Sequence, residues 1–268
     1  MRRSIGTVLT RAAAAGVCAL LLCQCASLEY AAQPQLLSHG PFDVYVYRPQ
    51  GAARNLVVFL SGDGGWGSEL GAIAQRLTMS GALVAGINVR RLLAEYRLDS
   101  APCVSTGPDL AELSRYLRQR YRLGPSGPVL VGHSAGATLA FVALAQSPAG
   151  TFAGALTLSF CEDLDLVKPL CPAPDTQPAI QSVARSDGVR LLPPARLPAP
   201  WLALHGLDDE VCPAPEARAF VEAIHGARFV GLPGIAHSYH HLSRWWPQFA
   251  AAYRELAPPA SASTAAVP

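Results

Sequence analysis

The chain has 268 residues, half of them apolar and 15% charged, which is enough for one sizeable hydrophobic core. We therefore expect a single domain. Residues 1–26 contain three of the 21 basic residues and none of the 19 acidic ones, so the remainder holds 18 basic and 19 acidic residues and is nearly neutral. This balance argues against a nucleic-acid partner, which favours a strongly basic face.

The first 26 residues have the layout of a secretory signal. Three arginines precede an uncharged stretch, residues 12–22, that ends near small residues. This order predicts export to the periplasm of a bacterium. The stretch is shorter than the roughly 20 apolar residues that span a bilayer. An uncleaved membrane anchor or a lipid on Cys23 or Cys25 is the alternative.

Four cysteines follow this segment: Cys103, Cys161, Cys171 and Cys212. An even number in an exported domain predicts two disulfides. Cys161 with Cys171 is the easiest closure, although three pairings are open. No Cys-x-x-Cys pair occurs, which disfavours zinc. We expect neither a metal nor a cofactor.

Strand and helix patterns alternate along the chain from residue 44 onward. Strands are predicted at residues 44–49, 55–62, 82–89, 128–134, 153–160, 200–206 and 227–234, and helices at 67–81, 106–121, 137–146 and 215–226. Each parallel crossover needs a helix to return. The pattern therefore predicts an α/β fold with a mostly parallel central sheet and helices on both faces.

Residues 161–200 interrupt this alternation and contain eight prolines. Such a segment is too rich in proline for a helical cap domain, so we expect an ordered excursion over the sheet edge. A final helix is predicted at 238–257, interrupted near Pro247. We expect the domain to span residues 27–256 and the tail, 257–268, to be disordered.

The segment PVLVGHSAGATLA places one serine, Ser134, between two glycines at a strand end and a helix start. In a Gly-x-Ser-x-Gly turn the serine adopts a tight, strained conformation, and the glycines avoid collisions with neighbouring backbone. The helix N-terminus favours a developing negative charge. These features predict Ser134 as a nucleophile.

A serine hydroxyl needs a histidine as base and an acid that orients the histidine. His237 follows the last predicted strand, and Asp209 follows the strand before it. The order serine, acid, histidine is the one this architecture uses. Asp208 is the alternative acid, although adjacent aspartates favour turns. His205 is expected to support the loop beneath Asp209.

Three histidines, His237, His240 and His241, have the i, i+3, i+4 spacing of metal ligands on a helix. No acid stands at ligand spacing beside them, so we disfavour a metal there as well.

The glycine-rich loop SGDGGW, residues 61–66, follows a buried strand. We expect the amides of Asp63 and Ala135 to bind an oxyanion. A phosphate cradle is the competing interpretation, but the loop lacks the lysine of a P-loop and the spacing of a dinucleotide site. Gly64, Trp66 and His133 are the candidate substrate contacts, although tryptophans more often serve packing.

Three motifs make the chain similar to one group of α/β-hydrolases. SGDGGW (61–66), GHSAGA (132–137) and LPGIAH (232–237) resemble the bacterial virulence protein VirJ and AcvB group over about residues 55–256. The resemblance implies a periplasmic serine hydrolase that cleaves the aminoacyl ester of lysyl- or alanyl-phosphatidylglycerol through an acyl-enzyme. The implied partner is a lipid or ester substrate, with peripheral contact at the periplasmic face of the inner membrane.

The chain departs from this group at Ala135, where members carry an aromatic residue, and at residues 238–241, where they carry acids. The aminoacyl group therefore does not follow from the resemblance. Asp63 or Glu162 is the candidate for pairing with the ammonium of the substrate. An esterase or thioesterase with another substrate, and a non-catalytic periplasmic protein that assists secretion, are the alternatives.

Overall fold

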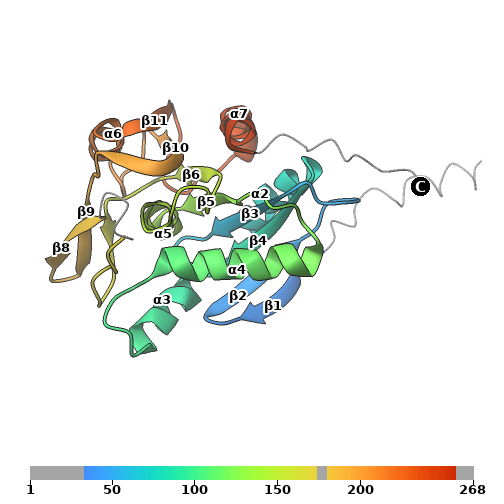
Figure 1. Cartoon of the computed structure of the whole chain (residues 1–268). Coiled ribbons are helices and arrows are strands. Elements are labelled where there is room, and N and C mark those ends of the chain that lie inside the picture. Colours follow the sequence, from blue (N-terminus) through green and yellow to red (C-terminus); the bar gives the residue numbers. More distant parts are fainter. Residues whose placement is uncertain (1–32, 174–179, 258–268) are drawn as a thin grey trace, which may run out of the picture. The chain divides into compact units, whose positions relative to one another are not determined.

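A computed structural model describes residues 33–173 and 180–257, and Figure 1 labels their helices and strands. The predicted leader and nearly all of the predicted tail lie outside these residues. Among the helices that are described, none is long and apolar enough to cross a bilayer.

An eight-stranded sheet forms the centre of the domain, in the order β1-β2-β4-β3-β5-β6-β10-β11. Its strands are β1 (Gln35–His39), β2 (Phe42–Tyr47), β3 (Asn55–Leu60), β4 (Ala82–Ile87), β5 (Val129–His133), β6 (Gly154–Leu158), β10 (Arg196–Gly206) and β11 (His225–Leu232). The strands from β4 to β11 pair in parallel, whereas β2 is antiparallel to β1 and β4. The predicted mostly parallel α/β-hydrolase sheet is confirmed.

Helices cover both faces of this sheet. They are α2 (Ser68–Met79), α3 (Val89–Leu98), α4 (Thr106–Tyr121), α5 (Ala135–Ala145), α6 (Ala214–Glu222) and α7 (Trp246–Leu256). The buried side chains of α2 and α7 pack in one core, and those of α3, α4, α5 and α6 pack in the other. The central strands are therefore buried on both sides, which explains their continuous apolar sequences.

Among the strands of the central sheet and its covering helices, β1 and α3 go beyond the sequence prediction. Helix α3 begins after Asn88, whose side chain accepts a hydrogen bond from the N–H of Arg91. It buries Leu92, Leu93 and Tyr96. This N-cap and the helical spacing of the buried residues were the available signals for α3. Strand β1 lies at the sheet edge and is mostly exposed, so its pattern is weak.

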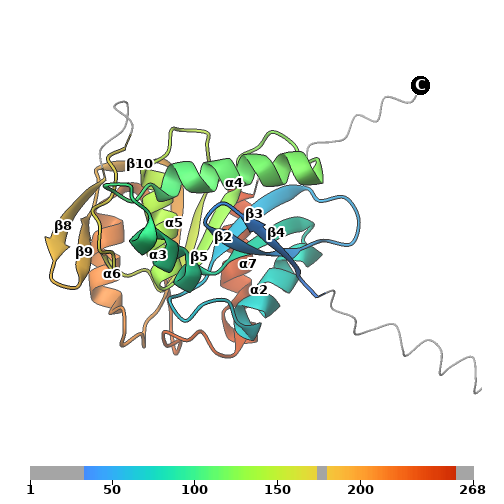
Figure 2. The ribbon, with the colours of Figure 1, turned by 90° about the horizontal axis from the view of Figure 1, so that it is seen from below.

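The proline-rich excursion contains a second sheet. Its three strands, in the order β7-β9-β8, are β7 (Asp163–Leu164), β8 (Gln181–Arg185) and β9 (Gly188–Leu192). Leu164, Val189 and Leu191 are buried in the same core as α5. The β8–β9 hairpin lies beside α6 in both views (Figure 1, Figure 2). Residues 161–173 and 180–200 of the excursion are ordered and not helical, as predicted, but the sequence did not indicate this small sheet.

Two disulfides join Cys103 to Cys171 and Cys161 to Cys212. The predicted number is confirmed, whereas the pairing of Cys161 with Cys171 is wrong. Strands β6 and β10 are neighbours, so the segments after them, with Cys161 and Cys212, lie side by side. Cys171 instead donates its N–H to the carbonyl of Val104 at 2.9 Å, which places it beside Cys103.

The predicted helix at 238–257 is wrong in its first part. Residues 239–241 are not helical, a 3-10 helix follows at Leu242–Arg244, and α7 begins at Trp246. Pro247 lies in the first turn of α7, where a missing N–H costs no hydrogen bond. Pro247 therefore lies at the start of the helix and does not interrupt it.

Candidate active site

Ser134 lies between the end of β5 and the start of α5, with φ of 55°. A residue other than glycine is strained in this conformation. A Cβ on Gly136 would lie 2.2 Å from the carbonyl oxygen of Ser61, and one on Gly132 would lie 2.2 Å from that of Gly136. The start of α5 therefore contacts the end of β3 through backbone. The predicted function of the two glycines is confirmed.

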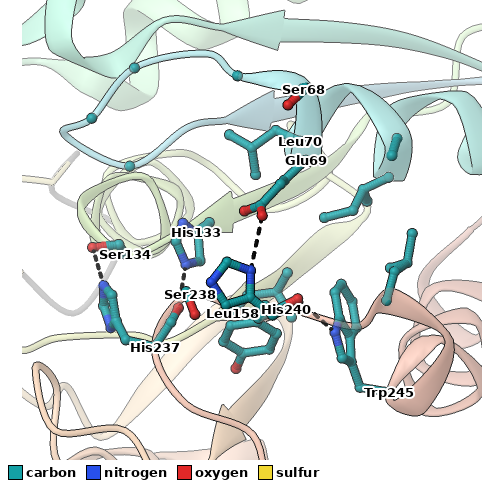
Figure 3. Close-up of a pocket in the computed structure, with 18 of the residues that line it drawn as sticks. Ser68, Glu69, Leu70, His133, Ser134, Leu158, His237, Ser238, His240 and Trp245 are labelled. Atoms are coloured by element: carbon teal, nitrogen blue, oxygen red, sulfur yellow. Dashed lines mark hydrogen bonds and ion pairs between the residues drawn. The ribbon is translucent and has the colours of Figure 1, made fainter.

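Ser134, His237 and Asp209 form a hydrogen-bonded series, and Figure 3 shows its bond between Ser134 and His237. Nε2 of His237 lies 3.0 Å from Oγ of Ser134, and Nδ1 lies 3.0 Å from both carboxylate oxygens of Asp209. When Nδ1–H donates to the carboxylate, Nε2 is free to accept the serine proton. The structure thus brings the three predicted residues together, and their catalytic functions stay predictions.

The carboxylate of Asp209 is buried and receives several hydrogen bonds. The N–H groups of Val211 and Cys212 donate to Oδ1 at 3.0 and 2.9 Å, and the hydroxyl of Ser159 donates to Oδ2. Burial alone would raise the pKa of Asp209, but hydrogen bonds from His237, Ser159 and Cys212 outweigh it and hold the pKa well below its usual range. Asp208 is exposed, so the geometry favours Asp209 as the acid.

Two residues of this network, Ser159 and Tyr239, are absent from the sequence prediction. Both have positive φ, at 51° and 54°. The Tyr239 hydroxyl accepts from the N–H of Ser159 at 3.1 Å and of Gly206 at 3.2 Å, and donates to the carbonyl of Leu204 at 2.8 Å. It ties the ends of β6 and β10 to the loop that carries His237. Their only sequence signal is their position, directly after β6 and two residues after His237.

Two other histidines, His133 and His205, form hydrogen bonds to the loops that carry His237 and Asp209. His133 donates from Nε2 to the carbonyl of His237 at 2.9 Å, and His205 donates from Nε2 to the carbonyl of Cys212 at 2.7 Å. Among the described residues Nδ1 of His205 has no partner. Burial lowers the pKa of both histidines, which favours their neutral forms. His205 supports the loop beneath Asp209, as predicted.

The SGDGGW loop lies against the nucleophile. A Cβ on Gly62 would be 3.4 Å from the Cβ of Ser134. The N–H of Asp63 makes no backbone hydrogen bond to a described residue outside the helices and strands. Ala135 is the first residue of α5, so its N–H has no acceptor within the helix. Both amides are free for an oxyanion, and that function stays a prediction.

Trp66 anchors the far end of this loop. Its indole N–H donates to the hydroxyl of Tyr47 at 3.0 Å, and its ring packs edge-on against Phe59. A Cβ on Gly86 would lie 2.4 Å from the ring, so this glycine leaves the space that the indole fills. Trp66 is not among the residues that line the cavity at Ser134. The structure therefore gives Trp66 a packing position, and its predicted substrate contact stays a prediction.

A cavity of about 610 Å³ opens beside Ser134, and Gly64 and His133 are part of its lining. Apolar side chains, Leu158 and Trp245 among them, form part of its lining (Figure 3). At the rim Glu69 pairs with His240 at 3.0 Å. The structure thus places two of the three predicted substrate contacts at the site.

The predicted acids for a substrate ammonium differ in their surroundings. Glu162 pairs with Arg190 at 2.6 Å, which neutralises it. Asp63 is exposed, and among the described residues it has no ion pair. The geometry favours Asp63.

The described residues do not fit a metal centre. Residues 239–241 are not helical, so His237, His240 and His241 do not have the i, i+3, i+4 arrangement of a helix in space. Asp209, Cys212 and His237 lie close enough to share an ion, but Cys212 belongs to a disulfide and offers no thiolate.

The model of the family described as bacterial virulence protein (VirJ) matches residues 54–154. This segment contains SGDGGW and GHSAGA and ends before LPGIAH. A comparison with curated protein sequences found no match.

Solved esterase structures share the fold of the chain. Est1E from Butyrivibrio proteoclasticus has 13% identity and a TM-score of 0.55, covering 84% of this chain and 98% of that one. Butyrate-bound Est2 from Thermogutta terrifontis has 16% identity and a TM-score of 0.55, covering 85% and 94%. Esterase PE8 has 20% identity and a TM-score of 0.53, covering 80% and 99%. At these identities the likeness establishes the fold.

Proposed function

We propose that this chain, which has the α/β-hydrolase fold and matches the VirJ family model at residues 54–154, is a serine hydrolase of carboxylic esters. The observation that carries the proposal is the series from Ser134 through His237 to Asp209. A protein that only binds has no need of a hydroxyl, an imidazole and a carboxylate in this order.

In the proposed reaction Oγ of Ser134 attacks the ester carbonyl while Nε2 of His237 takes the hydroxyl proton. The amides of Asp63 and Ala135 stabilise the negative oxygen. The bond to the leaving alcohol breaks as His237 returns the proton to the alcohol oxygen. Water then attacks the acyl-enzyme with His237 as base, which releases the acid and restores Ser134.

The proposed substrate is the aminoacyl ester of aminoacylated phosphatidylglycerol, lysyl or alanyl. The VirJ family segment supports this choice. So does the free carboxylate of Asp63 at the nucleophile, which suits the ammonium beside an aminoacyl carbonyl. Among the described elements no helical cap covers the site, which suits a bulky lipid headgroup.

The proposed location is the periplasm, with peripheral contact at the inner membrane. Two disulfides support an exported protein, and the signal-like residues 1–26 agree with it.

A fluorophosphonate probe and a substrate panel test both levels of the proposal. We expect labelling of the wild type and of Ser68→Ala, a control serine that also lines the cavity, and no labelling of Ser134→Ala. Purified protein would be incubated with synthetic lysyl- and alanyl-phosphatidylglycerol and with simple esters side by side. Folded protein without labelling would favour the secretion-assisting protein, and hydrolysis of simple esters alone would favour an esterase with another substrate.

A further inference from the structure

A second cavity, of about 350 Å³, meets the larger one at the nucleophile. Asp63 and Ser134 line both cavities, and Ala135 lines the second. A substrate held at Ser134 therefore has space on two sides of its ester bond.

One wall of the second cavity is a face of α3. Arg90, Leu93 and Arg97 line it, and their spacing of three and four residues places them on the same side of the helix. The facing wall belongs to the excursion and includes Cys161. The disulfide to Cys212 fastens this wall to the loop after β10. The cavity is thus built from fixed elements.

Most charges around this cavity are neutralised by neighbours. Arg97 pairs with Asp165 at 2.8 Å, and Asp163 pairs with Arg190 at 3.2 Å. Within residues 33–173 and 180–257, no ion pair or side-chain hydrogen bond involves the other cation of the lining, Arg90. Arg90 is exposed at the cavity and free to bind an anion.

The two charges that are unpaired among the described residues, on Asp63 and Arg90, occupy different positions along the site. Asp63 lines both cavities, as Ser134 does, whereas Arg90 lines only the second cavity. A complementary ester carries a cation beside its carbonyl and an anion farther along its alcohol half. An aminoacyl ester of a phosphodiester has this order, with the ammonium on the carbon next to the carbonyl and the phosphodiester beyond the ester oxygen. A guanidinium also matches the geometry of phosphate oxygens.

We propose that the second cavity is an anion subsite that receives the phosphodiester of the substrate, with Arg90 as the residue that recognises it. The inference rests on the proposed hydrolase function. It places the alcohol half of the ester in the second cavity and the aminoacyl side chain in the larger one.

The test compares the full-length wild type with Arg90→Gln on two substrates, alanyl-phosphatidylglycerol in detergent micelles and alanine p-nitrophenyl ester, which lacks phosphate. For the lipid we expect KM to rise about tenfold, the loss of one charge-assisted contact, with kcat kept within about twofold. The aryl ester should be hydrolysed as by the wild type. Arg90→Lys should recover part of the lipid KM, because it retains the charge.

Arg91→Gln is the matched control, since Arg91 is the next residue, is exposed, and pairs with Glu95 outside the cavity. It should behave as the wild type on both substrates. Glycerol phosphate should inhibit aryl ester hydrolysis by the wild type competitively and inhibit Arg90→Gln far less. Inorganic phosphate as a second inhibitor would show whether the glycerol part is recognised as well.

Equal losses on both substrates, or none on either, would overturn the subsite. If the wild type cleaves the lipid and Arg90→Gln matches it, the subsite fails while the hydrolase function stands. If the wild type cleaves only the aryl ester but glycerol phosphate inhibits it through Arg90, the subsite stands and the aminoacyl-lipid substrate fails.

Discussion

The two sides of the site are held in place by different interactions. On the side of His237, the buried hydroxyl of Tyr239 makes three hydrogen bonds to backbone, and Ser159 bonds Asp209. On the side of the excursion, two disulfides and exposed ion pairs such as Arg97–Asp165 hold the wall. Exposed pairs contribute at most about 1 kcal/mol each. The reaction geometry therefore depends on buried hydrogen bonds and the substrate wall on covalent links, of which Cys103–Cys171 can be removed without disturbing the reaction geometry.

The largest expected effect on kcat comes from substitution of Asp209, the buried acid of the hydrogen-bonded series. Asp209→Asn should lower kcat about 10⁴-fold, because an amide no longer holds His237 in the tautomer that accepts the serine proton. Asp208→Asn is the control, since its side chain is exposed, and should stay within about twofold of the wild type. Steady-state kinetics on a simple ester measure both, and similar losses in the two variants would contradict the assignment of Asp209.

Tyr239→Phe tests whether the buried network positions the histidine loop. We expect kcat to fall by roughly 10- to 100-fold with little change in KM, because the loop shifts relative to Ser134. Tyr253→Phe removes another largely buried hydroxyl, which accepts from Asn55 at 2.7 Å away from the site. Both variants should unfold at lower temperature. A kcat as little affected by Tyr239→Phe as by Tyr253→Phe would give Tyr239 a purely structural function.

Removal of each disulfide in turn shows which of the two links affects kcat as well as stability. The double variant Cys103→Ala/Cys171→Ala should lose about 2–5 kcal/mol of unfolding free energy and keep kcat on a simple ester within about threefold. Cys161→Ala/Cys212→Ala should also lower kcat, by roughly tenfold. Without the disulfide the loop at position 212 is held less firmly, and the backbone N–H of this residue bonds Asp209. Chemical denaturation would measure the unfolding free energy and steady-state kinetics would measure kcat. Equal kcat in both variants would contradict the claim that only the Cys161–Cys212 link supports the reaction geometry.

The smallest expected effect is on stability against pH. Burial holds the pKa of His133 and His205 below their ordinary 6.5, so below about pH 6.5 the unfolded chain binds more protons than the folded one. The stability contribution is complete above this pH and is lost as the pH falls toward the folded pKa. We expect a lower Tm at pH 5.5 than at 7.5.

His205→Gln should reduce this difference in Tm, because it removes one of the two buried imidazoles. His225→Gln, at an exposed position, should leave the difference as in the wild type. A difference in Tm that His205→Gln does not change would exclude His205 as a source.

The fold and the hydrogen-bonded series could be predicted because each depends on local patterns. Continuous apolar strands indicate a buried parallel sheet, and the loops after its strands converge at one edge. The turn at Ser134 and the positions of Asp209 and His237 follow from that arrangement. Neither inference needs the order of the strands.

The remaining features depend on which strands are neighbours. The pairing of Cys161 with Cys212 follows from β6 lying beside β10. The hydroxyl of Tyr239 reaches β6 and β10 for the same reason. The cavity along α3 depends on how this helix faces a small sheet that the sequence pattern did not indicate. A single sequence gives no information on such long-range contacts.

The SGDGGW loop is held in place by contacts at both of its ends. Ser61 accepts from the N–H of Val89 at one end, and the Trp66 indole fills the space left by Gly86 at the other. The direction of the Asp63 amide is thus set by two points on β4 and its continuation, on the far side of β3 from Ser134. A bulkier residue at position 86 would displace the tryptophan and slow the chemistry without any contact to substrate.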